Sequence, residues 1–201
     1  MLKVWQEALL DIVYPPKCPV CHARVEVHGA WCRVCLAGVW QPREINLAMH
    51  RLTALAGCLA VADYSDGVKR LLYAIKYWQM PCYAVYLTWL LRQADISRFG
   101  RPDLVVPVPL HHDRLARRGY NQTSLIFRPW AVDKGLQWRE DVLLRHQPTL
   151  PQWELPLSGR RRNIKGAFQV TRRDLVEGKC ILLVDDIITT GATLAECSTT
   201  L

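Results

Sequence analysis

The sequence predicts an α/β protein, with a central, mostly parallel sheet flanked by helices and a small four-cysteine domain at the N-terminus. Three short apolar runs end in polar or charged groups, before Asp63, before His111 and before Asp185. Helical patterns separate these runs, and such alternation is typical of parallel sheets with crossover helices. The chain has 201 residues, 50% of them hydrophobic, which is enough for one full domain and a small appendage.

Residues 1–14 are expected to form a short amphipathic helix. Leu2, Trp5 and Leu9 recur at helical spacing, whereas Glu7 and Asp11 interrupt the apolar core that a signal peptide would need. The chain has no apolar run long enough to cross a bilayer. We therefore expect a cytoplasmic protein without a membrane span.

Four cysteines within residues 15–40 follow the spacing C-x2-C-x10-C-x2-C and predict a zinc site. Two close pairs, separated by a hairpin-like stretch over 25–31, would supply four thiolates to a tetrahedral ion. A disulfide would require an oxidising compartment, and a redox CxxC would not come as a matched pair. His22 and His28 are alternative ligands in a variant site. The expected ligands of structural Zn²⁺ are Cys18, Cys21, Cys32 and Cys35.

The next segment leads into the main domain, which we assign to residues 55–201. Residues 40–54 are polar around Pro42 and predict a linker. Residues 55–65 predict a strand, and 67–81 and 82–94 predict two helices. The aromatic residues of these helices favour a core role at their helical spacing, and the alternative is stacking on single-stranded bases. They are Tyr73, Tyr77, Trp78, Tyr83, Tyr86 and Trp89.

Residues 104–110 predict a second strand, with Pro107 and Pro109 near its end. His111, Arg114 and Arg118 follow this strand directly. Ligands of α/β sheets bind at the carboxyl ends of the strands, where several cations would neutralise a diphosphate. A further helix is expected over 123–127.

Residues 144–170 are polar and basic, and their prolines at 148, 151 and 156 predict a long loop. A long loop in a compact domain is usually functional or disordered. This one would act as a mobile flap over an anionic substrate, and the alternative is a solvated basic loop. The basic residues of this flexible loop are Arg160, Arg161, Arg162 and Lys165.

The most informative stretch is CILLVDDIITTGAT, residues 180–193. A short apolar strand (181–184) ends in Asp185 and Asp186, and a hydroxyl-rich turn around Gly191 leads into a helix over 192–200. Backbone N–H groups, threonine hydroxyls and the positive end of a helix dipole would meet there and bind a phosphate monoester. The carboxylates would repel phosphate and suit sugar hydroxyls or a metal ion. The combination describes a site for a 5-phosphoribosyl group.

The net charge of +8 is concentrated in the middle of the chain. Residues 101–173 contain 14 Lys and Arg against 6 Asp and Glu. A basic surface of this kind suits pyrophosphate, nucleotides or nucleic acid. The alternative is a basic face that is merely solvated.

Residues 181–193 resemble the phosphoribosyl pyrophosphate (PRPP) signature of type I phosphoribosyltransferases. The whole chain looks like the ComF (ComF/GntX) family of competence proteins. That resemblance rests on the cysteine knuckles after PPKCPVC, then AIKYWQMP, VPVPLHHDRLARRGYNQ, R-x-x-N-x-x-x-A-F over 160–168, and LLVDDIITTGAT. It implies a type I phosphoribosyltransferase-like fold, PRPP with Mg²⁺, and a part in DNA uptake during natural transformation. It also implies single-stranded DNA and other competence proteins, such as a DNA-import helicase, as partners.

The resemblance also implies roles for individual residues. Asp185 and Asp186 would read the ribose hydroxyls, and the flexible loop would be the flap over the substrate. The turn and helix start that would hold the 5′-phosphate comprise Ile188, Thr189, Thr190, Gly191, Ala192 and Thr193. The pyrophosphate loop would comprise Val108, Pro109, Leu110, His111, Arg114 and Arg118.

Two departures from the family pattern bear on activity. The chain ends at Leu201, soon after the phosphate turn, where family members continue into another strand, so we expect a truncated domain. Thr189 stands where oxopurine-specific members carry an aspartate, which makes purine salvage a weaker expectation. The expected enzyme is a phosphoribosyltransferase of unknown acceptor. The alternatives are a non-catalytic competence factor that binds PRPP or nucleic acid, and a nucleobase-salvage enzyme.

Overall fold

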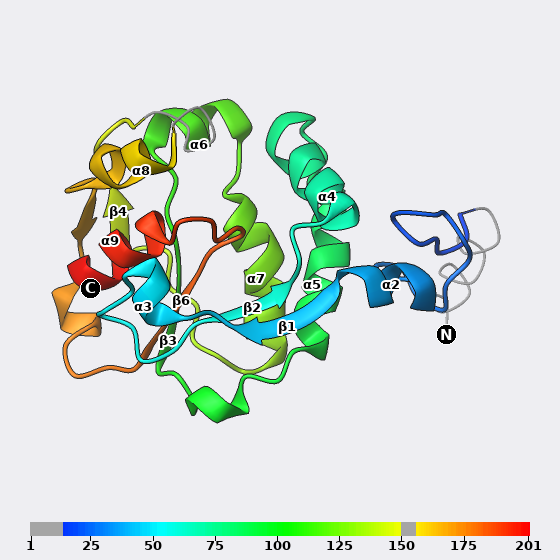
Figure 1. The fold of residues 1–201 in the computed structure, drawn as a ribbon, viewed down its shortest axis with the longest axis horizontal. Coiled ribbons are helices and arrows are strands. Elements are labelled where there is room, and N and C mark those ends of the chain that lie inside the picture. Colours follow the sequence, from blue (N-terminus) through cyan, green and yellow to red (C-terminus); the bar gives the residue numbers. More distant parts are fainter. Residues whose placement is uncertain (1–13, 150–155) are drawn as a thin grey trace, which may run out of the picture.

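The computed structural model describes residues 14–149 and 156–201. The predicted N-terminal helix over 1–14 therefore lies almost entirely outside the described residues. Figure 1 shows a main body built around strands β3 and β6, with the cysteine-rich segment at the opposite end from the C-terminus.

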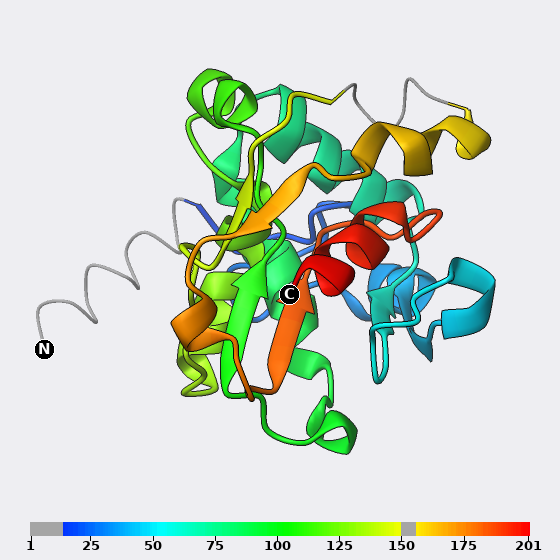
Figure 2. The ribbon, with the colours of Figure 1, turned by 90° about the vertical axis from the view of Figure 1, so that its left-hand side faces the viewer.

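Strands β3 (Leu104–Pro107) and β6 (Ile181–Val184) pair in parallel, with Leu104 opposite Ile181 and Pro107 opposite Val184. Figure 2 shows the two strands side by side and running in the same direction. Residues around Trp138 extend this sheet on the other side of β3 through a parallel bridge to Val105. The expected parallel sheet is thus present between β3 and β6, and β6 has the predicted bounds. The regular part of β3 ends at residue 107 rather than at the predicted 110.

Both faces of this parallel pair are covered, because successive side chains of a strand point in opposite directions. Val105 and Val184 pack against helices α4 (Asp66–Tyr77), α5 (Ala84–Gln93) and α7 (Gln122–Asp133). Leu104 and Val106 face the opposite cluster, which includes α9 (Ala192–Thr200) and strands β4 (Leu143–Arg145) and β5 (Phe168–Val170). The apolar runs therefore form a buried sheet.

Two further strand pairs are antiparallel, so the sheet structure is less uniformly parallel than predicted. Strand β1 (Trp40–Glu44) pairs with β2 (Leu59–Ala62), and β4 pairs with β5. The run before Asp63 does form a strand, but among the described residues it pairs with β1 and not with β3 or β6.

The prediction of a linker over 40–54 was wrong. This segment holds β1 and the short helix α3 (Leu47–His50), whose N-cap Asn46 accepts a hydrogen bond from the Met49 N–H. Strand β1 is stabilised by pairing with β2 and contains a register irregularity after Trp40. Its sequence, WQPRE, shows no alternation of apolar and polar residues that would predict a strand. Tertiary pairing decides the structure of such segments more than local propensity does.

The prediction of an irregular loop over 144–170 was also wrong. Residues Leu157–Ile164 form helix α8, and β4 and β5 lie before and after it. Ile164 is 1% exposed and anchors α8 in the core with Phe168. The remaining elements are α2 (Arg33–Val39), α6 (His112–Arg118) and short 3-10 turns η1 (Pro81–Tyr83), η2 (Ser97–Phe99) and η4 (Arg173–Leu175).

Candidate functional site

The four cysteines of the predicted zinc site come together. One sulfur from each of Cys18, Cys21, Cys32 and Cys35 lies within 4.8 Å of the others, and the Sγ atoms of Cys21 and Cys32 are 3.5 Å apart. Tetrahedral zinc with Zn–S bonds of about 2.3 Å needs sulfurs roughly 3.8 Å apart. The cluster therefore has the spacing and donor set of a four-cysteine zinc site.

Local backbone bonds build the first cysteine pair into a tight turn. The Cys18 N–H donates to Ala23 O at 2.8 Å, and Val25 N–H donates to Pro16 O at 3.0 Å. The hairpin lies here, around residues 17–24, and not over 25–31 as predicted, because 25–31 has no strand. Burial by itself would raise the pKa of Cys18, but backbone hydrogen bonds from Cys21, Cys32 and Val20 lower it to about 6. The lowered pKa favours the thiolate of Cys18, the form that ligates zinc, whereas burial and then the neighbouring cysteines raise the pKa of Cys35 to about 12.

Trp31 fixes the cysteine-rich segment to the main body. Its side chain is 4% exposed, and its indole N–H donates to Tyr86 O at 3.0 Å. Gly67 of α4 lies against Trp31 and Val20, with no space for a side chain at residue 67. The zinc segment is thus packed on α4 and α5.

The second site lies at the carboxyl edge of β3 and β6. The Val108 N–H donates to Val184 O at 2.9 Å, so the chain segments that leave the two strands begin side by side. The predicted pyrophosphate loop and the acidic pair therefore start at the same edge of the sheet. Ligands of α/β proteins bind at this kind of edge.

The two carboxyl groups of the acidic pair are partly buried and interact electrostatically. Burial, and then the charge of Asp186, raise the pKa of Asp185 to about 8. The Lys76 ammonium lies 2.7 Å from Asp186 Oδ2, and these side chains are 17% and 6% exposed. Burial alone would lower the pKa of Lys76, but the charge of Asp186 raises it. The site therefore holds one carboxylate paired with a cation beside a second carboxyl group that burial keeps protonated near neutral pH.

Lys76 was not predicted as a site residue, although its position on α4 carries a signal. Val68, Leu72 and Lys76 are four residues apart on α4 and so share one face of the helix. Val68 and Leu72 are buried on that face. A lysine that continues a buried stripe needs a partner, and Asp186 is that partner.

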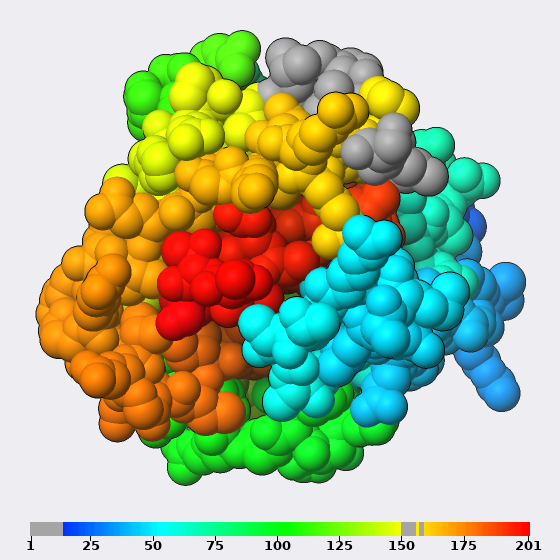
Figure 3. All heavy atoms as spheres, turned by 60° about the vertical axis from the view of Figure 1, so that its left-hand side comes forward, coloured from blue at the N-terminus to red at the C-terminus, as the bar shows by residue number. Residues whose placement is uncertain are grey.

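The predicted phosphate turn runs into α9 through a left-handed residue. Gly191 has φ +74° and is the N-cap residue of α9, and the Ala192 N–H at the start of the helix donates to Thr190 Oγ1 at 3.4 Å. A Cβ at residue 191 would lie 3.0 Å from His50 Cβ and 3.2 Å from His50 O. Glycine is therefore needed here for both its conformation and its lack of a side chain. Figure 3 shows this C-terminal segment between the α3 segment and the α8 segment.

Helix α8 carries the predicted flap arginines and already contacts the phosphate turn. Arg160 Nη1 donates to Thr189 Oγ1 at 3.1 Å. Arg161 Nη2 donates to His50 O at 2.7 Å and to Thr190 O at 3.3 Å. Arg162 and Lys165 are exposed. Two of the four predicted residues thus lie at the turn, on a helix instead of in a loop.

The predicted pyrophosphate loop folds into the start of α6. Asn121 holds it by donating from Nδ2 to Val108 O at 3.1 Å. Arg118 bonds to Gln122, and burial lowers its pKa while the charge of Asp186 raises it, which places this cation in the field of the acidic pair. Arg114 instead donates to Thr149 O at 2.5 Å. His111 is 4% exposed, and its Nδ1 accepts from the Asp113 N–H as the cap of α6.

Arg145 is a second residue that the sequence analysis did not identify. It is 6% exposed, bonds to Thr149 and lies over the Phe168 ring at 5.6 Å. Burial, and then the charge of Arg114, lower its pKa to about 10. Arg145 lies within the predicted loop over 144–170, where one more basic residue gave no local signal.

The crowded aromatic residues divide into two groups. Tyr83, Tyr86 and Trp89 are partly buried against the core, as the core interpretation predicts. Tyr73, Tyr77 and Trp78 are 47%, 46% and 62% exposed, so the core interpretation was wrong for them.

The chain is similar to a zinc ribbon family and to DNA-utilization and competence proteins. Residues 9–45 match the double zinc ribbon domain family, and this match together with the cysteine cluster supports a structural zinc site. The chain is 30% identical to the DNA utilization protein YhgH of Salmonella typhimurium over 92% of this chain and 90% of that protein. It is 28% identical to competence protein F of Haemophilus influenzae, over 91% and 77% of the two chains. It is 27% identical to competence protein ComFC of Bacillus subtilis, over 88% and 68%.

Two negative findings complete the comparison. No solved structure matches the chain, so the type I phosphoribosyltransferase-like fold stays a prediction. Among the helices that the structure describes, none is both long enough and apolar enough to span a membrane.

Proposed function

The chain belongs to the ComF family of competence and DNA-utilization proteins, and from that premise we propose that its main domain binds PRPP at the carboxyl edge of β3 and β6. The observation that carries the proposal is the junction of three features at this edge. The acidic pair, the glycine turn into α9 and the basic segment after β3 all start there. A phosphorylated sugar with a diphosphate needs receptors of these three kinds.

The turn from Thr189 to Thr193 would hold the 5′-phosphate. Gly191 has no side chain that could cap α9, and the long 3.4 Å bond from the Ala192 N–H to Thr190 Oγ1 would give way to an anion at the helix N-terminus. Arg160 and Arg161 are anchored on the Thr189 hydroxyl and the Thr190 carbonyl. Their positive charge would lower the cost of bringing a phosphate dianion to this turn.

Asp185 and Asp186 would accept hydrogen bonds from the 2′ and 3′ hydroxyls of the ribose. The Lys76 ammonium, 2.7 Å from Asp186 Oδ2, orients this side chain without ligand. Asp185 is protonated near neutral pH because of its burial, which raises its pKa. Binding of a diol would favour its ionised form, so PRPP binding would release a proton to solvent.

If the site turns over, the C1–O bond to the diphosphate breaks and the diphosphate leaves with the bonding electrons. An acceptor atom then bonds to C1 and gives its proton to solvent. Arg118, in the field of the acidic pair, would attract the leaving group. Mg²⁺ bound with PRPP would neutralise charge on the diphosphate, and Asp185 and Asp186 are the carboxylates at this edge that suit it. The acceptor is not specified by any residue that we identify, and Thr189 makes an oxopurine a weak candidate.

As a second role we propose contact with single-stranded DNA in the cytoplasm. The names of the relatives, a DNA utilization protein and a competence protein, and the net charge of +8 support a role that involves DNA. In this role PRPP would be bound with or without turnover, and other competence proteins would be partners. The two roles do not exclude each other, since the PRPP site occupies one edge of the sheet.

The test of the PRPP site is isothermal titration calorimetry with PRPP and Mg²⁺. The wild type is compared with Asp185→Asn/Asp186→Asn, after circular dichroism has shown that both are folded. We expect binding by the wild type and its loss in the double variant. Heat changes that are equal in the two proteins would place PRPP elsewhere and overturn the proposal.

A further inference from the structure

We propose that the hollow between the zinc segment and helices α4 and α5 binds single-stranded nucleic acid by stacking its bases on Trp78 and neighbouring tyrosines. This inference rests on the DNA-associated role proposed above and concerns a different part of the molecule from the PRPP site. We define the groove by its central residues, which are Lys17, His22, Arg70, Trp78, Tyr83 and Tyr86.

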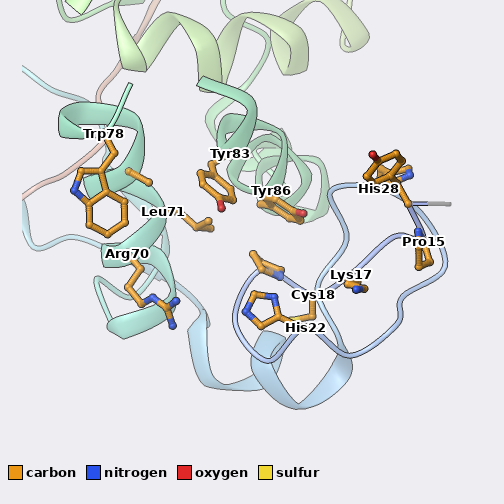
Figure 4. A pocket seen from close by; sticks show the side chains of 13 residues that line it. Pro15, Lys17, Cys18, His22, His28, Arg70, Leu71, Trp78, Tyr83 and Tyr86 are labelled. Carbon is orange, nitrogen blue, oxygen red and sulfur yellow. The ribbon is translucent and has the colours of Figure 1, made fainter. Parts of the chain in front are cut away.

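The groove has the size and position of a binding site. Its volume is about 380 Å³. Figure 4 shows Arg70 on α4, Trp78 at the C-terminal end of this helix, and Lys17 and His22 on the zinc segment, with Tyr83 and Tyr86 between them. The indole bond from Trp31 to Tyr86 O holds the zinc segment in place and so fixes the width of the groove.

The lining combines flat apolar rings with positive charge. Lys17 and Arg70 are exposed cations, and no Asp or Glu occurs among the lining residues that the structure describes. A groove for a protein helix would gain from aliphatic lining, but Leu71 is the only Leu, Ile, Val or Met among these lining residues. Aromatic faces next to unopposed cations suit a ligand that has both planar rings and negative charge. A nucleic acid strand with exposed bases is such a ligand.

The exposed aromatics extend beyond the groove. Trp78 is 62% exposed, which is unusual for the largest apolar side chain. The Tyr73 ring lies 5.4 Å from the Trp78 ring and 4.6 Å from the Tyr77 ring. Stacked or edge-on aromatics on the outside of α4 would let several successive bases bind, whereas a single small ligand would use the groove alone.

A double-stranded ligand fits less well, since its bases are paired and stacked inside the duplex. The rings of the groove reach only bases that are free to turn outwards. We therefore expect a preference for single strands. Phosphates of the strand would lie at Lys17 and Arg70, on opposite walls of the groove.

The test uses the full zinc-loaded chain and a fluorescein-labelled oligothymidylate, with binding measured by fluorescence anisotropy at several salt concentrations. We expect Trp78→Ala to weaken binding roughly 5- to 100-fold, because removal of one base–aromatic stack typically has this effect. Trp78→Phe should recover most of the affinity, since it keeps a stacking face. The Lys17→Ala/Arg70→Ala variant should also reduce the slope of log affinity against log salt, by about 0.7 for each phosphate that the variant no longer neutralises.

Matched controls distinguish binding in the groove from nonspecific attraction by positive charge and from binding at the PRPP site. Lys179→Ala removes an exposed cation elsewhere and should leave binding within about two-fold of wild type. Trp78→Ala should still bind PRPP, and Asp185→Asn/Asp186→Asn should still bind the oligonucleotide. A wild type that binds the oligonucleotide but not PRPP would count against the proposed function and leave the groove proposal intact.

Three outcomes of the variant and duplex titrations would overturn the inference. They are unchanged affinity in folded Trp78→Ala, an equal decrease in Lys179→Ala, and equal affinity for a duplex of the same length. Titration with an oligouridylate of the same length compares RNA with DNA. We expect similar affinities, because stacking on bases and contacts to phosphates do not involve the 2′-hydroxyl. Absence of any binding by the wild type at low salt would also refute it.

Discussion

The Lys76 ammonium lies 2.7 Å from the Asp186 carboxylate, and this contact joins helix α4 to the turn after β6. Both side chains are largely removed from solvent. The pair orients one of the two carboxylates proposed to bind ribose. It also connects the helix that carries the proposed nucleic acid groove to the edge that carries the proposed PRPP site.

Lys76→Met should lower the free energy of unfolding by roughly 3 kcal/mol, because it leaves a buried carboxylate without its cation. Urea denaturation followed by circular dichroism measures this decrease. Lys69→Met is the matched control, since Lys69 is exposed on the same helix and should change stability by less than about 0.5 kcal/mol. Equal effects of the two substitutions would show that the ion pair contributes nothing specific.

The raised pKa of Asp185 predicts a pH dependence of stability. The folded pKa is about 8 and the ordinary value is 3.8, so between these limits the folded protein holds a proton that the unfolded chain has released. The stabilisation is complete below about pH 4 and declines as the pH rises towards 8, by at most about 1.4 kcal/mol per pH unit. Asp185→Asn removes this pH dependence.

Chemical denaturation of wild type and Asp185→Asn at pH 5, 6, 7 and 8 checks the sign. The variant should become more stable relative to the wild type as the pH rises. A difference that is constant with pH would mean that Asp185 is already ionised in the folded protein. PRPP affinity measured over the same range should increase with pH, because ligand binding favours the ionised form.

Gly191→Ala should impair the phosphate turn more than backbone strain alone explains. Gly191 and Gly178 have nearly the same positive φ, +74° and +70°, but only residue 191 faces His50 and Leu52. A left-handed alanine costs about 1–2 kcal/mol at either position. We expect Gly191→Ala to decrease stability and PRPP affinity more than Gly178→Ala does. Urea denaturation and PRPP titration of the two variants measure this difference, which reports the crowding against α3. Identical behaviour of the two variants would contradict the described packing.

Several elements could be predicted from local sequence because they are locally encoded. Strand β6 and helix α9 have the predicted bounds, since an unbroken apolar run and a small-residue helix start carry their own signals. The cysteine cluster follows from spacing alone. These features depend on neighbours in the chain, so a periodicity or motif is enough to find them.

Other features depend on partners distant in the chain and were missed for that reason. Strand β1 exists through its pairing with β2, and α8 is held by Ile164 in the core despite the prolines nearby. Lys76 and Arg145 become site residues only when α4 and β4 are placed in the fold. The exposure of Trp78 likewise depends on which face of α4 meets the zinc segment.

The cysteine cluster should bind about one zinc ion per chain. Cys32→Ser should abolish the tightly bound metal and loosen the contact of Trp31 with Tyr86, because folding of such a segment is coupled to metal binding. Elemental analysis gives the zinc content, and near-ultraviolet circular dichroism reports the Trp31 environment. Cys82→Ser is the control, since Cys82 is exposed and outside the cluster. Retention of zinc by Cys32→Ser would refute the assigned ligand set.

The central claim is that PRPP binds where the chain leaves β3 and β6. Hydrogen exchange followed by mass spectrometry, with and without saturating PRPP and Mg²⁺, tests it without any substitution. We expect slower exchange in residues 185–195 and 108–118, and little change in residues 17–39 of the zinc segment. Unchanged exchange at the strand edge, or protection confined to other segments, would contradict the account.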